Sequence, residues 1–466
     1  MGDLRLDAGE TSLLVDLYEL TMAAACFEKG LNAEATFSLS VRRLPPRRGY
    51  MVAAGIERIL EVLEDFHFDD AAVGYLDSLK IFKPEFLHYL AGLRFTGEVR
   101  ALAEGTLFFA DEPVIEVRAP FIEAQLIETI AINQIATASL IATKAARCFA
   151  VAGGRRLLDF GLRRSHGADA GLIAARSTHI AGFSGTSNVL AGRRYGIPVY
   201  GTMAHSYVMA HEHERDAFEQ FARAFPRLGT LLVDTYDTVR GVENAAAVAR
   251  ELAASGITLT GIRIDSGDLL ALSRRARRIL DEAGLRDVAI FASGDIDEFA
   301  ITELVAASAP IDAFGVGTAV AVSRDVPWLD CIYKLVEYGG AARLKTARNK
   351  PSLPGRKQIF RAFDRSGAMI ADRLGLEEER PVSVRAEFRH APEDVKMILE
   401  TRMAGGVRTV PAQTLAEARE RFLAGFAVLD NRHKGIENPE AYPVRHTAAL
   451  KALIISERVR AEHRQD

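Results

Sequence analysis

Four short apolar runs in the middle of the chain each end in a small, polar cluster that is rich in glycine. Their sequences are IPVYGTMAHS (197–206), LTGIRIDSGDL (259–269), VAIFASGDID (288–297) and IDAFGVGTAV (311–320). Apolar runs of this length, separated by helix-like stretches, predict buried parallel strands. Ligands bind at the carboxyl ends of such strands. We therefore expect the polar side chains of these clusters to face one common site.

The alternation of strand and helix patterns extends through the central part of the chain. Strands are also predicted at RRLLDFG (155–161) and GTLLVDT (229–235), and helices at roughly 207–225, 241–255, 268–284 and 297–308. Alternating strands and helices predict a parallel sheet or barrel. Six strand candidates are fewer than the eight of a complete barrel. The pattern therefore predicts a distorted or incomplete barrel.

The two ends of the chain have a different texture, typical of an α+β region. The N-terminal part predicts a helix at 11–30, a strand at 35–43, a helix at 56–66 and short antiparallel strands within 97–118. A long Ala- and Ile-rich helical stretch begins at about residue 122, and short strands reappear after about 330. The tail predicts a helix near 414–424 and a charged end that frays. We therefore divide the chain into an N-terminal α+β domain (1–121), a barrel domain (122–330) and a C-terminal segment that rejoins the first domain (331–466).

Composition narrows the class of protein. The chain has 466 residues, 48% of them hydrophobic and 26% charged, with a formal net charge of −4. This balance gives no reason to expect nucleic acid or a membrane as a partner. The three cysteines, Cys26, Cys148 and Cys331, lie far apart, which excludes a zinc knuckle and indicates a reducing compartment. No signal peptide or membrane span is expected, so the sequence predicts a cytoplasmic protein of enzyme size.

The sharpest local motif is RIDSGDL (263–269). On a strand, Arg263 and Asp265 point to the same face because side chains alternate with a period of two. Arginine can hold a carboxylate or phosphate with two hydrogen bonds, and aspartate can accept from ribose hydroxyls or hold a metal. A structural Arg–Asp pair that caps a helix explains the isolated motif equally well.

Two glycine-rich turns follow successive strands. Gly294 and Asp295 lie in the first, and Gly317 and Thr318 in the second. In barrels, backbone amides of such turns often hold a phosphate. Glycine and aspartate also mark ordinary turns, so each alone is weak, but two in consecutive units favour a phosphate site. The P-loop and dinucleotide-binding glycine patterns are both missing from the sequence.

Histidines and aromatic residues add further candidates. His205 follows an apolar run, where it can act as a base, a ligand or a nucleophile toward phosphate, or simply be structural. His211 and His213 are two residues apart on a predicted helix and share no face, so we expect them to be exposed rather than to bind zinc. In DFGLRR (159–164), Phe160 is suited to stack on a flat ring and Arg163 to meet an acid on it, although a core Phe beside surface arginines is as common.

Taken in order, these segments resemble the nicotinate phosphoribosyltransferase family. The resemblance begins at VDLYELTM (15–22) and covers about 350 residues; its other segments are DFGLRR, GFSGTSNVLAG (182–192), GTMAHS, VDTYDT (233–238), RIDSGDL, SGDID, DAFGVGT, YKLVE (333–337) and PGRK (354–357). Each segment alone is weak, but the ordered series is specific. The last hundred residues carry no motif that we can place.

The resemblance implies an α/β fold, with an irregular TIM-like (β/α) barrel beside an open-faced α+β sandwich built from N-terminal and C-terminal segments. It also implies a homodimer with shared active sites, in which DLYELTM reaches into the site of the other subunit. Tyr18 and Phe160 would then sandwich the pyridine ring, and Asp16 would help to hold the sugar–pyrophosphate side.

The resemblance also implies roles for the barrel residues. Arg163, Arg263 and Asp265 would hold the phosphoribosyl donor and orient the ring, with the choice of Arg163 over Arg164 resting on motif alignment. The glycine-rich turns would bind the 5′-phosphate and ribose through Gly294, Asp295, Gly317 and Thr318. His205 would be phosphorylated by ATP.

The implied reaction joins nicotinate to 5-phosphoribosyl 1-pyrophosphate (PRPP), forming nicotinate mononucleotide and pyrophosphate with coupled ATP hydrolysis. Mg²⁺ would accompany PRPP and ATP, and no residue is assigned as its ligand. The basic stretch RLKTARNKPSLPGRK (343–357) is either a polyphosphate-binding loop or a solvated one.

Several alternatives stay open. Nicotinamide phosphoribosyltransferases carry an Asp at the position matching Ser187; it would repel the carboxylate of nicotinate by roughly a few kcal/mol, so Ser187 favours the acid. Quinolinate phosphoribosyltransferases share the barrel type but are shorter. A Schiff-base aldolase using Lys144 or Lys334, and a non-catalytic barrel relative, are the alternatives of other classes.

Overall fold

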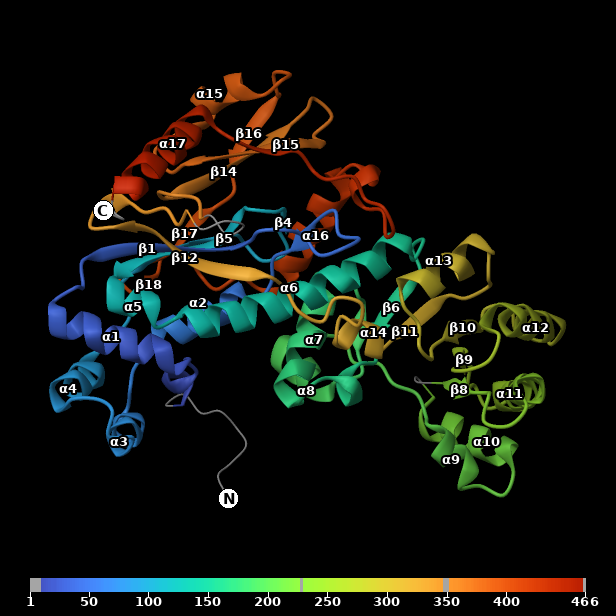
Figure 1. The fold of residues 1–466 in the computed structure, drawn as a ribbon. Coiled ribbons are helices and arrows are strands. Elements are labelled where there is room, and N and C mark those ends of the chain that lie inside the picture. Colours follow the sequence, from blue (N-terminus) through green and yellow to red (C-terminus); the bar gives the residue numbers. More distant parts are fainter. Residues whose placement is uncertain (1–9, 227–228, 347–351, 464–466) are drawn as a thin grey trace. The chain divides into compact units, whose positions relative to one another are not determined.

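The chain folds into two compact units. The computed structural model describes residues 10–226, 229–346 and 352–463 (Figure 1). Unit 1 comprises Met1–Leu140 with Trp328–Asp466, and unit 2 comprises Ile141–Pro327. The domain boundaries at 122 and 331 stay predictions from the sequence.

Unit 2 is built around a six-stranded parallel sheet. Its order is β7-β6-β11-β10-β9-β8, with strands β6 (Arg156–Asp159), β7 (Gly185–Thr186), β8 (Thr230–Leu232), β9 (Gly261–Ile264), β10 (Ala289–Ala292) and β11 (Ala313–Val316). Strands that follow one another in sequence are neighbours from β8 to β11, and β11 then pairs with β6. This is the strand order of a (β/α) barrel that is open between β7 and β8.

The helices of unit 2 begin close to the strand ends. They are η2 (Leu162–Arg164), α7 (Ala168–Ile180), α8 (Val189–Tyr195), α9 (His205–Met209), α10 (Glu214–Ala224), α11 (Thr238–Ala253), α12 (Leu269–Glu282), α13 (Glu298–Ala306) and α14 (Thr318–Ala321). Aspartates cap three of them: the side chains of Asp237, Asp268 and Asp297 accept hydrogen bonds from backbone amides of the first turn. Such caps satisfy donors that a helix leaves open and set where each helix starts.

Two predictions in this region are wrong. The segment IPVYGT (197–202) was expected to form a strand, but only Val199 pairs, through a single parallel bridge to Thr186. The strand beside β6 is instead β7, within GFSGTS. The helix expected at 207–225 is divided into α9 and α10, and His213 is the residue before the second of these.

Unit 1 contains a seven-stranded sheet of order β13-β12-β1-β5-β3-β17-β18. Its strands are β1 (Glu34–Val41), β3 (Glu98–Ala101), β5 (Pro113–Pro120), β12 (Cys331–Tyr338), β13 (Ala341–Ala342), β17 (Glu400–Ala404) and β18 (Val407–Arg408). β1 pairs with β5 on one side and with β12 on the other, both antiparallel. This arrangement confirms that the chain returns to its N-terminal sheet after residue 330.

A four-stranded sheet of order β16-β14-β15-β19 and a two-stranded pair complete the β structure described in unit 1. These strands are β14 (Lys357–Phe363), β15 (Met369–Leu376), β16 (Asp394–Met397) and β19 (Val444–His446), with β2 (Met51–Val52) and β4 (Leu107–Phe108) as the pair. A buried cluster that includes Phe360, Ala362, Val384 and Phe388 packs this sheet against α15 (Pro381–Val384) and the turn that follows it.

Helices predicted at 11–30, 56–66 and 414–424 correspond to α1, α2 and α16, whereas most of the other helices of unit 1 were not predicted. They are η1 (Thr11–Leu13), α1 (Leu17–Lys29), α2 (Ile56–Glu64), α3 (Asp70–Ser78), α4 (Pro84–Gly92), α5 (Phe121–Gln125), α15 (Pro381–Val384), η3 (Arg385–Glu387), α16 (Leu415–Val428), η4 (Asn431–His433) and α17 (Ala448–His463). The charged tail was expected to fray, but α17 continues to His463 and buries Leu450 and Glu457. This prediction is therefore wrong.

The helix α6 (Glu128–Val151) is the longest of the described chain, and it begins in unit 1 and ends in unit 2. The stretch Phe121–Val151 is long and apolar enough to cross a membrane, but 61% of its most apolar part is buried inside the protein. Burial of this kind is typical of a core helix, so length and composition alone are weak evidence of a membrane span.

Candidate functional site

The carboxyl ends of the strands of unit 2 meet at one edge of the parallel sheet. Register places Ala292 beside Ile264, Val316 beside Asp159, and Asp159 beside Thr186. Most of the predicted site residues of unit 2 come within a few residues of these strand ends: Phe160, Arg163, Ser187, Asp265, Gly294, Asp295, Gly317 and Thr318. Arg263 lies within β9 itself. The structure therefore brings them to the same edge, as the pattern of apolar runs indicates.

Arg263 is the most extensively bonded of these residues. Its Nε donates to Oγ of Ser293 at 2.7 Å, its Nη1 to Oγ1 of Thr202 at 3.0 Å, and its Nη2 to Oδ1 of Asp265 at 2.5 Å. The side chain is 12% exposed, and its Cζ lies 5.5 Å from the ring centroid of Phe160. Three partners from three segments fix the guanidinium plane, which is the condition for directional binding of an anion.

Asp265 stays ionised because its partners outweigh its burial. Burial raises the pKa of this carboxyl. The hydrogen bond from Ser293, the charge and hydrogen bond of Arg263, and the charge of His205 lower the pKa by more than burial raises it. The net pKa is below the ordinary value for aspartate. An ionised carboxylate that is held in place is suited to accept from hydroxyl groups or to contact a cation.

Asp234 belongs to the same cluster, although the motifs did not single it out as a site residue. Its Oδ2 accepts from the backbone N of Asp265 at 2.9 Å and from Oγ of Ser266 at 2.7 Å. Its Oδ1 is buried and has no hydrogen-bond partner among the described residues. The sequence signal was a strand that ends in Val-Asp-Thr, the same kind of polar strand end as the four that we had selected.

These carboxylates fit a magnesium ion that arrives with its phosphates. Mg²⁺ prefers oxygen ligands and usually keeps waters and substrate phosphates, so one or two carboxylates suffice. The buried Oδ1 of Asp234, which has no hydrogen-bond partner among the described residues, and the carboxylate of Asp265 supply such ligands. Among the described residues no group of three or more His, Cys, Asp or Glu side chains is arranged to hold a metal by itself.

His205 is the first residue of α9 and is half-buried. Its Nδ1 lies 3.1 Å from Oγ1 of Thr235, a residue that follows β8. His213 is exposed, as predicted. His211 is half-buried, so the prediction that it is exposed is wrong: its Nδ1 lies 2.8 Å from the backbone O of Tyr207 and its Nε2 3.3 Å from Oε1 of Gln220. The structure thus separates His205, at the strand ends, from the two histidines that we had set aside.

The turn after β10 has a backbone that requires glycine. Gly294 has a φ of +89°, and a Cβ at this position would lie 1.8 Å from the backbone O of Asp265. Asp295 follows with a φ of +48°, which is uncommon for any residue other than glycine. Both residues are exposed, so the turn presents its backbone to the edge where Arg263 and Asp265 lie.

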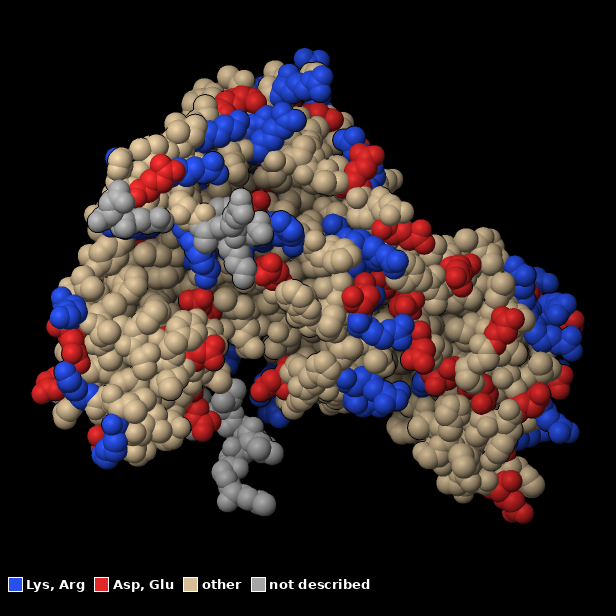
Figure 2. All heavy atoms as spheres, in the orientation of Figure 1, with Lys and Arg blue, Asp and Glu red and all other residues tan. Residues whose placement is uncertain are grey.

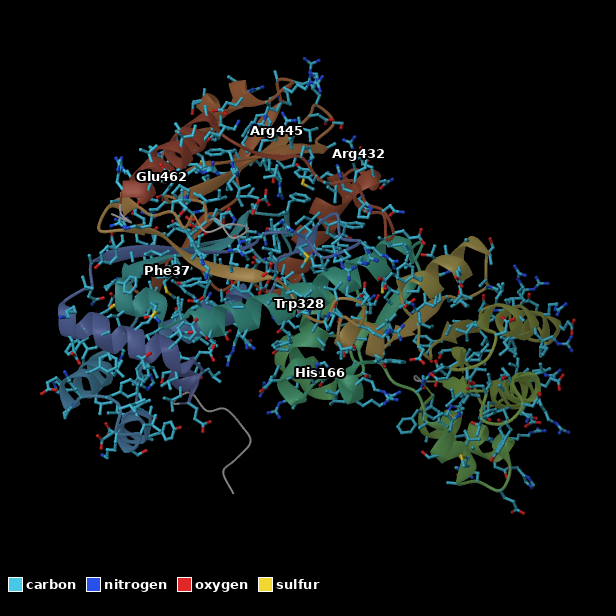
Figure 3. All side chains as sticks on the ribbon, in the orientation of Figure 1. Phe37, His166, Trp328, Arg432, Arg445 and Glu462 are labelled. Carbon is cyan, nitrogen blue, oxygen red and sulfur yellow. The ribbon has the colours of Figure 1, made fainter. Side chains whose placement is uncertain are left out.

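The aromatic part of the edge is formed by Phe160, whose ring centroid lies 5.6 Å from that of Phe291. Ser187 is half-buried, and its backbone N donates to the backbone O of Asp159 at 2.8 Å. Arg163 and Arg164 are both exposed on η2. His166, two residues after η2 and labelled in Figure 3, is exposed as well.

Two predicted residues, Asp16 and Tyr18, lie in unit 1. Tyr18 is 46% exposed, and burial of its hydroxyl with the charges of Glu128, Glu19 and Asp16 raises the pKa of this phenol. Oγ1 of Thr129 donates to Oδ2 of Asp16 at 3.2 Å and to Oε1 of Glu19. The start of α1 is thereby tied to the start of α6.

Lys144, one of the two lysines considered for a Schiff-base aldolase, is held in ion pairs. Lys144 is 1% exposed, and its Nζ lies 2.6 Å from Oε2 of Glu298 and 2.7 Å from Oδ1 of Asp325. A buried ammonium held by two carboxylates is not a nucleophile. Lys334, the other candidate, donates to the backbone O of Tyr333 and lies 3.8 Å from Glu128.

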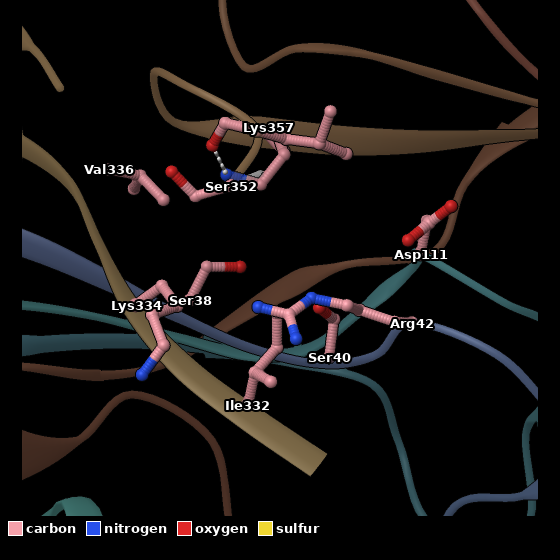
Figure 4. Close-up of a pocket in the computed structure, with 10 residues that line it drawn as sticks. Ser38, Ser40, Arg42, Asp111, Ile332, Lys334, Val336, Ser352 and Lys357 are labelled. Atoms are coloured by element: carbon pink, nitrogen blue, oxygen red, sulfur yellow. Dashed lines mark hydrogen bonds between the residues drawn. The ribbon is translucent and has the colours of Figure 1, made fainter. Parts of the chain in front are cut away.

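Unit 1 also contains a small basic pocket, drawn in Figure 4. Arg42, Lys334 and Lys357 line it from three different segments, together with Ser38 and Ser352. Lys357 is neutralised by Glu116, at 3.0 Å from its Nζ. The rest of the basic stretch 343–357 is described only in part, because residues 347–351 lie outside the described residues.

On the face drawn in Figure 2, positive and negative side chains are interspersed among uncharged ones. Lys and Arg side chains gather over α12, which contributes Arg274, Arg275 and Arg278. Arg274 donates to the backbone O of Ala307, so part of this charge has a structural use.

Comparisons with known proteins identify the same family in three regions of the chain. Residues 13–136 match the N-terminal domain of nicotinate phosphoribosyltransferase, 155–337 match the nicotinate phosphoribosyltransferase family, and 356–454 match the C-terminal domain of that enzyme. The last match lies in the part of the chain for which the sequence offered us no motif.

Individual proteins give the same answer. A nicotinate phosphoribosyltransferase of Mycobacterium tuberculosis is 50% identical over 364 residues, 78% of each chain, and one of Bacillus subtilis is 40% identical over 453 residues, 93% of this chain and 92% of that one. The crystal structure of human nicotinic acid phosphoribosyltransferase superposes with a TM-score of 0.84 and 31% identity, covering 95% of this chain and 99% of the human one. That match confirms the predicted fold class, and the chain belongs to the nicotinate phosphoribosyltransferase family.

Proposed function

We propose that this protein joins nicotinate to PRPP, forming nicotinate mononucleotide and releasing pyrophosphate, as a step of NAD biosynthesis. The observation that carries this proposal is the cluster of Arg263, Asp265 and Ser293 at the strand ends, with Phe160 beside it. It combines a fixed cation, an ionised carboxylate and an aromatic face, which are the groups required for an anionic sugar donor and a flat acceptor.

The reaction places modest demands on proton transfer. Pyrophosphate leaves as C1′ of the ribose gains positive charge, and the ring nitrogen of nicotinate attacks from the opposite side. The ring nitrogen is neutral and carries no proton, so no general base is required. When bound with PRPP, Mg²⁺ would supply charge that offsets the charge on the leaving pyrophosphate. Asp265 and Asp234 would hold that cation, while Arg263 orients the donor and Gly294 and Asp295 offer the turn for its phosphate.

The acid is favoured over the amide by Ser187. This residue directly follows β7 and is half-buried near Asp159. A serine hydroxyl can donate to a substrate carboxylate, whereas an aspartate would repel it. Transfer to nicotinamide, the alternative function, would be favoured by a carboxylate at position 187 that accepts from the amide of the substrate, and this chain has a serine there.

ATP hydrolysis would be coupled through His205. Thr235 occupies Nδ1, so we assign Nε2 as the nitrogen that accepts the phosphoryl group. A phosphohistidine at the first residue of α9 would lie close to the segment that carries Thr202, a partner of Arg263. Phosphorylation would thus act on the residues that orient the donor.

A homodimer with shared active sites is proposed from the exposed start of α1. Leu17, Tyr18 and Met22 are 54%, 46% and 41% exposed, although large apolar side chains are costly to leave in water. Covering them with a second subunit would place Asp16 and Tyr18 at the site of that subunit. We also propose a cytoplasmic location, because the three cysteines are free thiols and PRPP and ATP are intracellular metabolites.

The test is an assay of pyrophosphate release by the purified protein with PRPP and Mg²⁺, with and without ATP, comparing nicotinate, nicotinamide and quinolinate. We expect turnover with nicotinate and stimulation by ATP. Preference for nicotinamide or quinolinate would replace the proposed substrate, and no turnover with any ring would support a non-catalytic relative. A covalent adduct trapped by borohydride would support the aldolase.

A further inference from the structure

A buried carboxylate joins the ends of two neighbouring strands in unit 2. Asp159, the last residue of β6, is 1% exposed. Its Oδ1 accepts from the backbone N of Gly161 at 2.8 Å, and its Oδ2 accepts from Oγ1 of Thr186 at 2.6 Å. Thr186 ends β7 and is fully buried. One side chain therefore connects the exit of β6 to the exit of β7.

On the β7 side, the connection holds the residue that we expect to select the ring substituent. Oγ1 of Thr186 accepts from the backbone N of Asn188 at 3.0 Å, and the backbone N of Ser187 donates to the backbone O of Asp159 at 2.8 Å. The side chain of Asn188 in turn caps α8 through the backbone N of Ala191 and donates to the backbone O of Gly171. Ser187 is thus fixed on both sides by bonds that lead to Asp159.

On the β6 side, the same carboxylate holds the turn that carries Phe160 and Arg163. A Cβ on Gly161 would lie 2.4 Å from Cβ of Ala321 and 3.0 Å from Oδ1 of Asp159, so the backbone approaches the carboxylate closely. The backbone O of Gly161 accepts from the backbone N of Arg164 at 2.8 Å, which starts η2. The position of the turn is therefore set by the side chain of Asp159.

We propose that Asp159 and Thr186 are positioning residues for the nicotinate end of the site. They set the distance between the ring face of Phe160 and the hydroxyl of Ser187 without touching the substrate themselves. The inference rests on the proposed function, because it assigns the ring to this end of the edge.

The chemistry of the pair explains why these two residue types are needed. A carboxylate accepts from an amide and a hydroxyl at once, and a threonine hydroxyl donates to one partner while it accepts from another. Removing the hydroxyl leaves a buried carboxylate oxygen and the amide of Asn188 without partners, which forces the loop to shift. A small shift of a positioning loop is enough to weaken binding of a rigid substrate.

The test compares Thr186→Val with Thr186→Ser and with a matched control. Thr178→Val is the control, because Thr178 is also fully buried in unit 2, and its hydroxyl donates only to the backbone O of Ala175 within α7. In Thr186→Val we expect KM for nicotinate to rise about tenfold, equivalent to about 1.4 kcal/mol, while KM for PRPP changes little. Thr186→Ser and Thr178→Val should keep the wild-type KM for nicotinate.

Calorimetric titration with nicotinate measures the same effect without turnover. An unchanged Kd and KM for nicotinate in Thr186→Val, or an equal change in Thr178→Val, would overturn the inference while leaving the proposed function intact. Wild-type protein that neither binds nor converts nicotinate would overturn both. If Thr186→Val does not fold, as judged by circular dichroism, Asp159→Asn replaces it, because the amide keeps the shape but turns one acceptor into a donor.

Discussion

The Nε atom of Arg263 lies 2.7 Å from Oγ of Ser293, and this hydrogen bond joins the ends of two neighbouring strands, β9 and β10. Ser293 donates its own proton to Asp265, so one buried hydroxyl lies between the cation and the carboxylate of the candidate site. Ser293 therefore helps to fix both the guanidinium of Arg263 and the carboxylate of Asp265.

Replacing Ser293 with alanine should lower kcat/KM for PRPP by roughly tenfold to a hundredfold, because hydrogen bonds to charged groups contribute about 1.5–3 kcal/mol. Steady-state kinetics with PRPP as the varied substrate measures this loss. Ser273→Ala is the control, since Ser273 is also buried in unit 2 and its hydroxyl donates only to the backbone O of Leu270. Equal kinetics in the two variants would contradict the role assigned to Ser293.

Ser187→Asp should shift the ring preference from nicotinate toward nicotinamide. The new carboxylate repels the carboxylate of nicotinate and accepts from the amide of nicotinamide, with an expected change in the ratio of kcat/KM values of tenfold or more, about 1.4 kcal/mol. The ratio is measured with both rings at saturating PRPP. Ser187→Asn adds no charge and is the matched comparison, and an unchanged ratio in Ser187→Asp would remove the argument for the acid.

Wild-type protein incubated with ATP labelled on its γ-phosphate should gain a phosphate that is labile in acid and stable in base. His205→Ala should lose this label and keep some transfer that does not depend on ATP. His211→Ala is the control, because His211 contacts only the backbone O of Tyr207 and Oε1 of Gln220 among the hydrogen bonds described, and neither belongs to the candidate site. A wild-type protein that takes up no label would show that His205 has no coupling role in this chain.

The buried carboxyl of Glu19, in the first turn of α1, should make the stability of the protein depend on pH. Burial raises the pKa of this carboxyl from 4.5 to about 7, although Thr129 lowers it in part, while Glu128 and Asp16 raise it further. The folded state therefore binds a proton that the unfolded state releases between these two values, so stability falls as pH rises from 4.5 to 7. In Glu19→Gln we expect this part of the fall to disappear.

The measurement is urea unfolding of wild type and Glu19→Gln across that pH range. Glu85→Gln, an exposed site in the same unit, should retain the wild-type slope. Parallel pH profiles for all three proteins would show that Glu19 titrates as an ordinary glutamate.

Glu298→Gln should destabilise the protein by about 3–5 kcal/mol, because it leaves buried cations with one carboxylate fewer. Glu298 is fully buried and bonds both Lys144 and Arg147. Chemical unfolding gives the change in free energy. Glu303→Gln, exposed on the same helix, is expected to change it by less than about 0.5 kcal/mol.

The sequence alone predicted most of the parallel strands, because each is an apolar run that ends in glycine or aspartate. It placed one of them wrongly. IPVYGT has the apolar pattern of a strand but makes only the bridge at Val199, whereas the two-residue strand Gly185–Thr186 is too short to leave a periodic signal. A strand of two residues is too short to be recognised from hydrophobic periodicity, so the sequence pattern pointed to the longer apolar run instead.

The same limit applies to the site. Arg263 and Asp265 were visible because they are two residues apart on one strand. The partners that fix them, Thr202 and Ser293, are 61 and 30 residues from Arg263. Both lie in polar clusters that we expected to face a common site, but the sequence did not show which side chains of those clusters bond Arg263. Asp159 was hidden for a related reason: its importance comes from Thr186, which only the folded sheet brings beside it.

The barrel of unit 2 is open between its two edge strands, β7 and β8. Among the described residues, the backbone ladder ends at the Thr186–Val199 bridge on one side and at β8 on the other. Side chains span the opening: His205 contacts Thr235, and Thr202 accepts from Arg263. Widening or narrowing of the barrel at this position would therefore break side-chain hydrogen bonds of the site before it broke any pairing between strands.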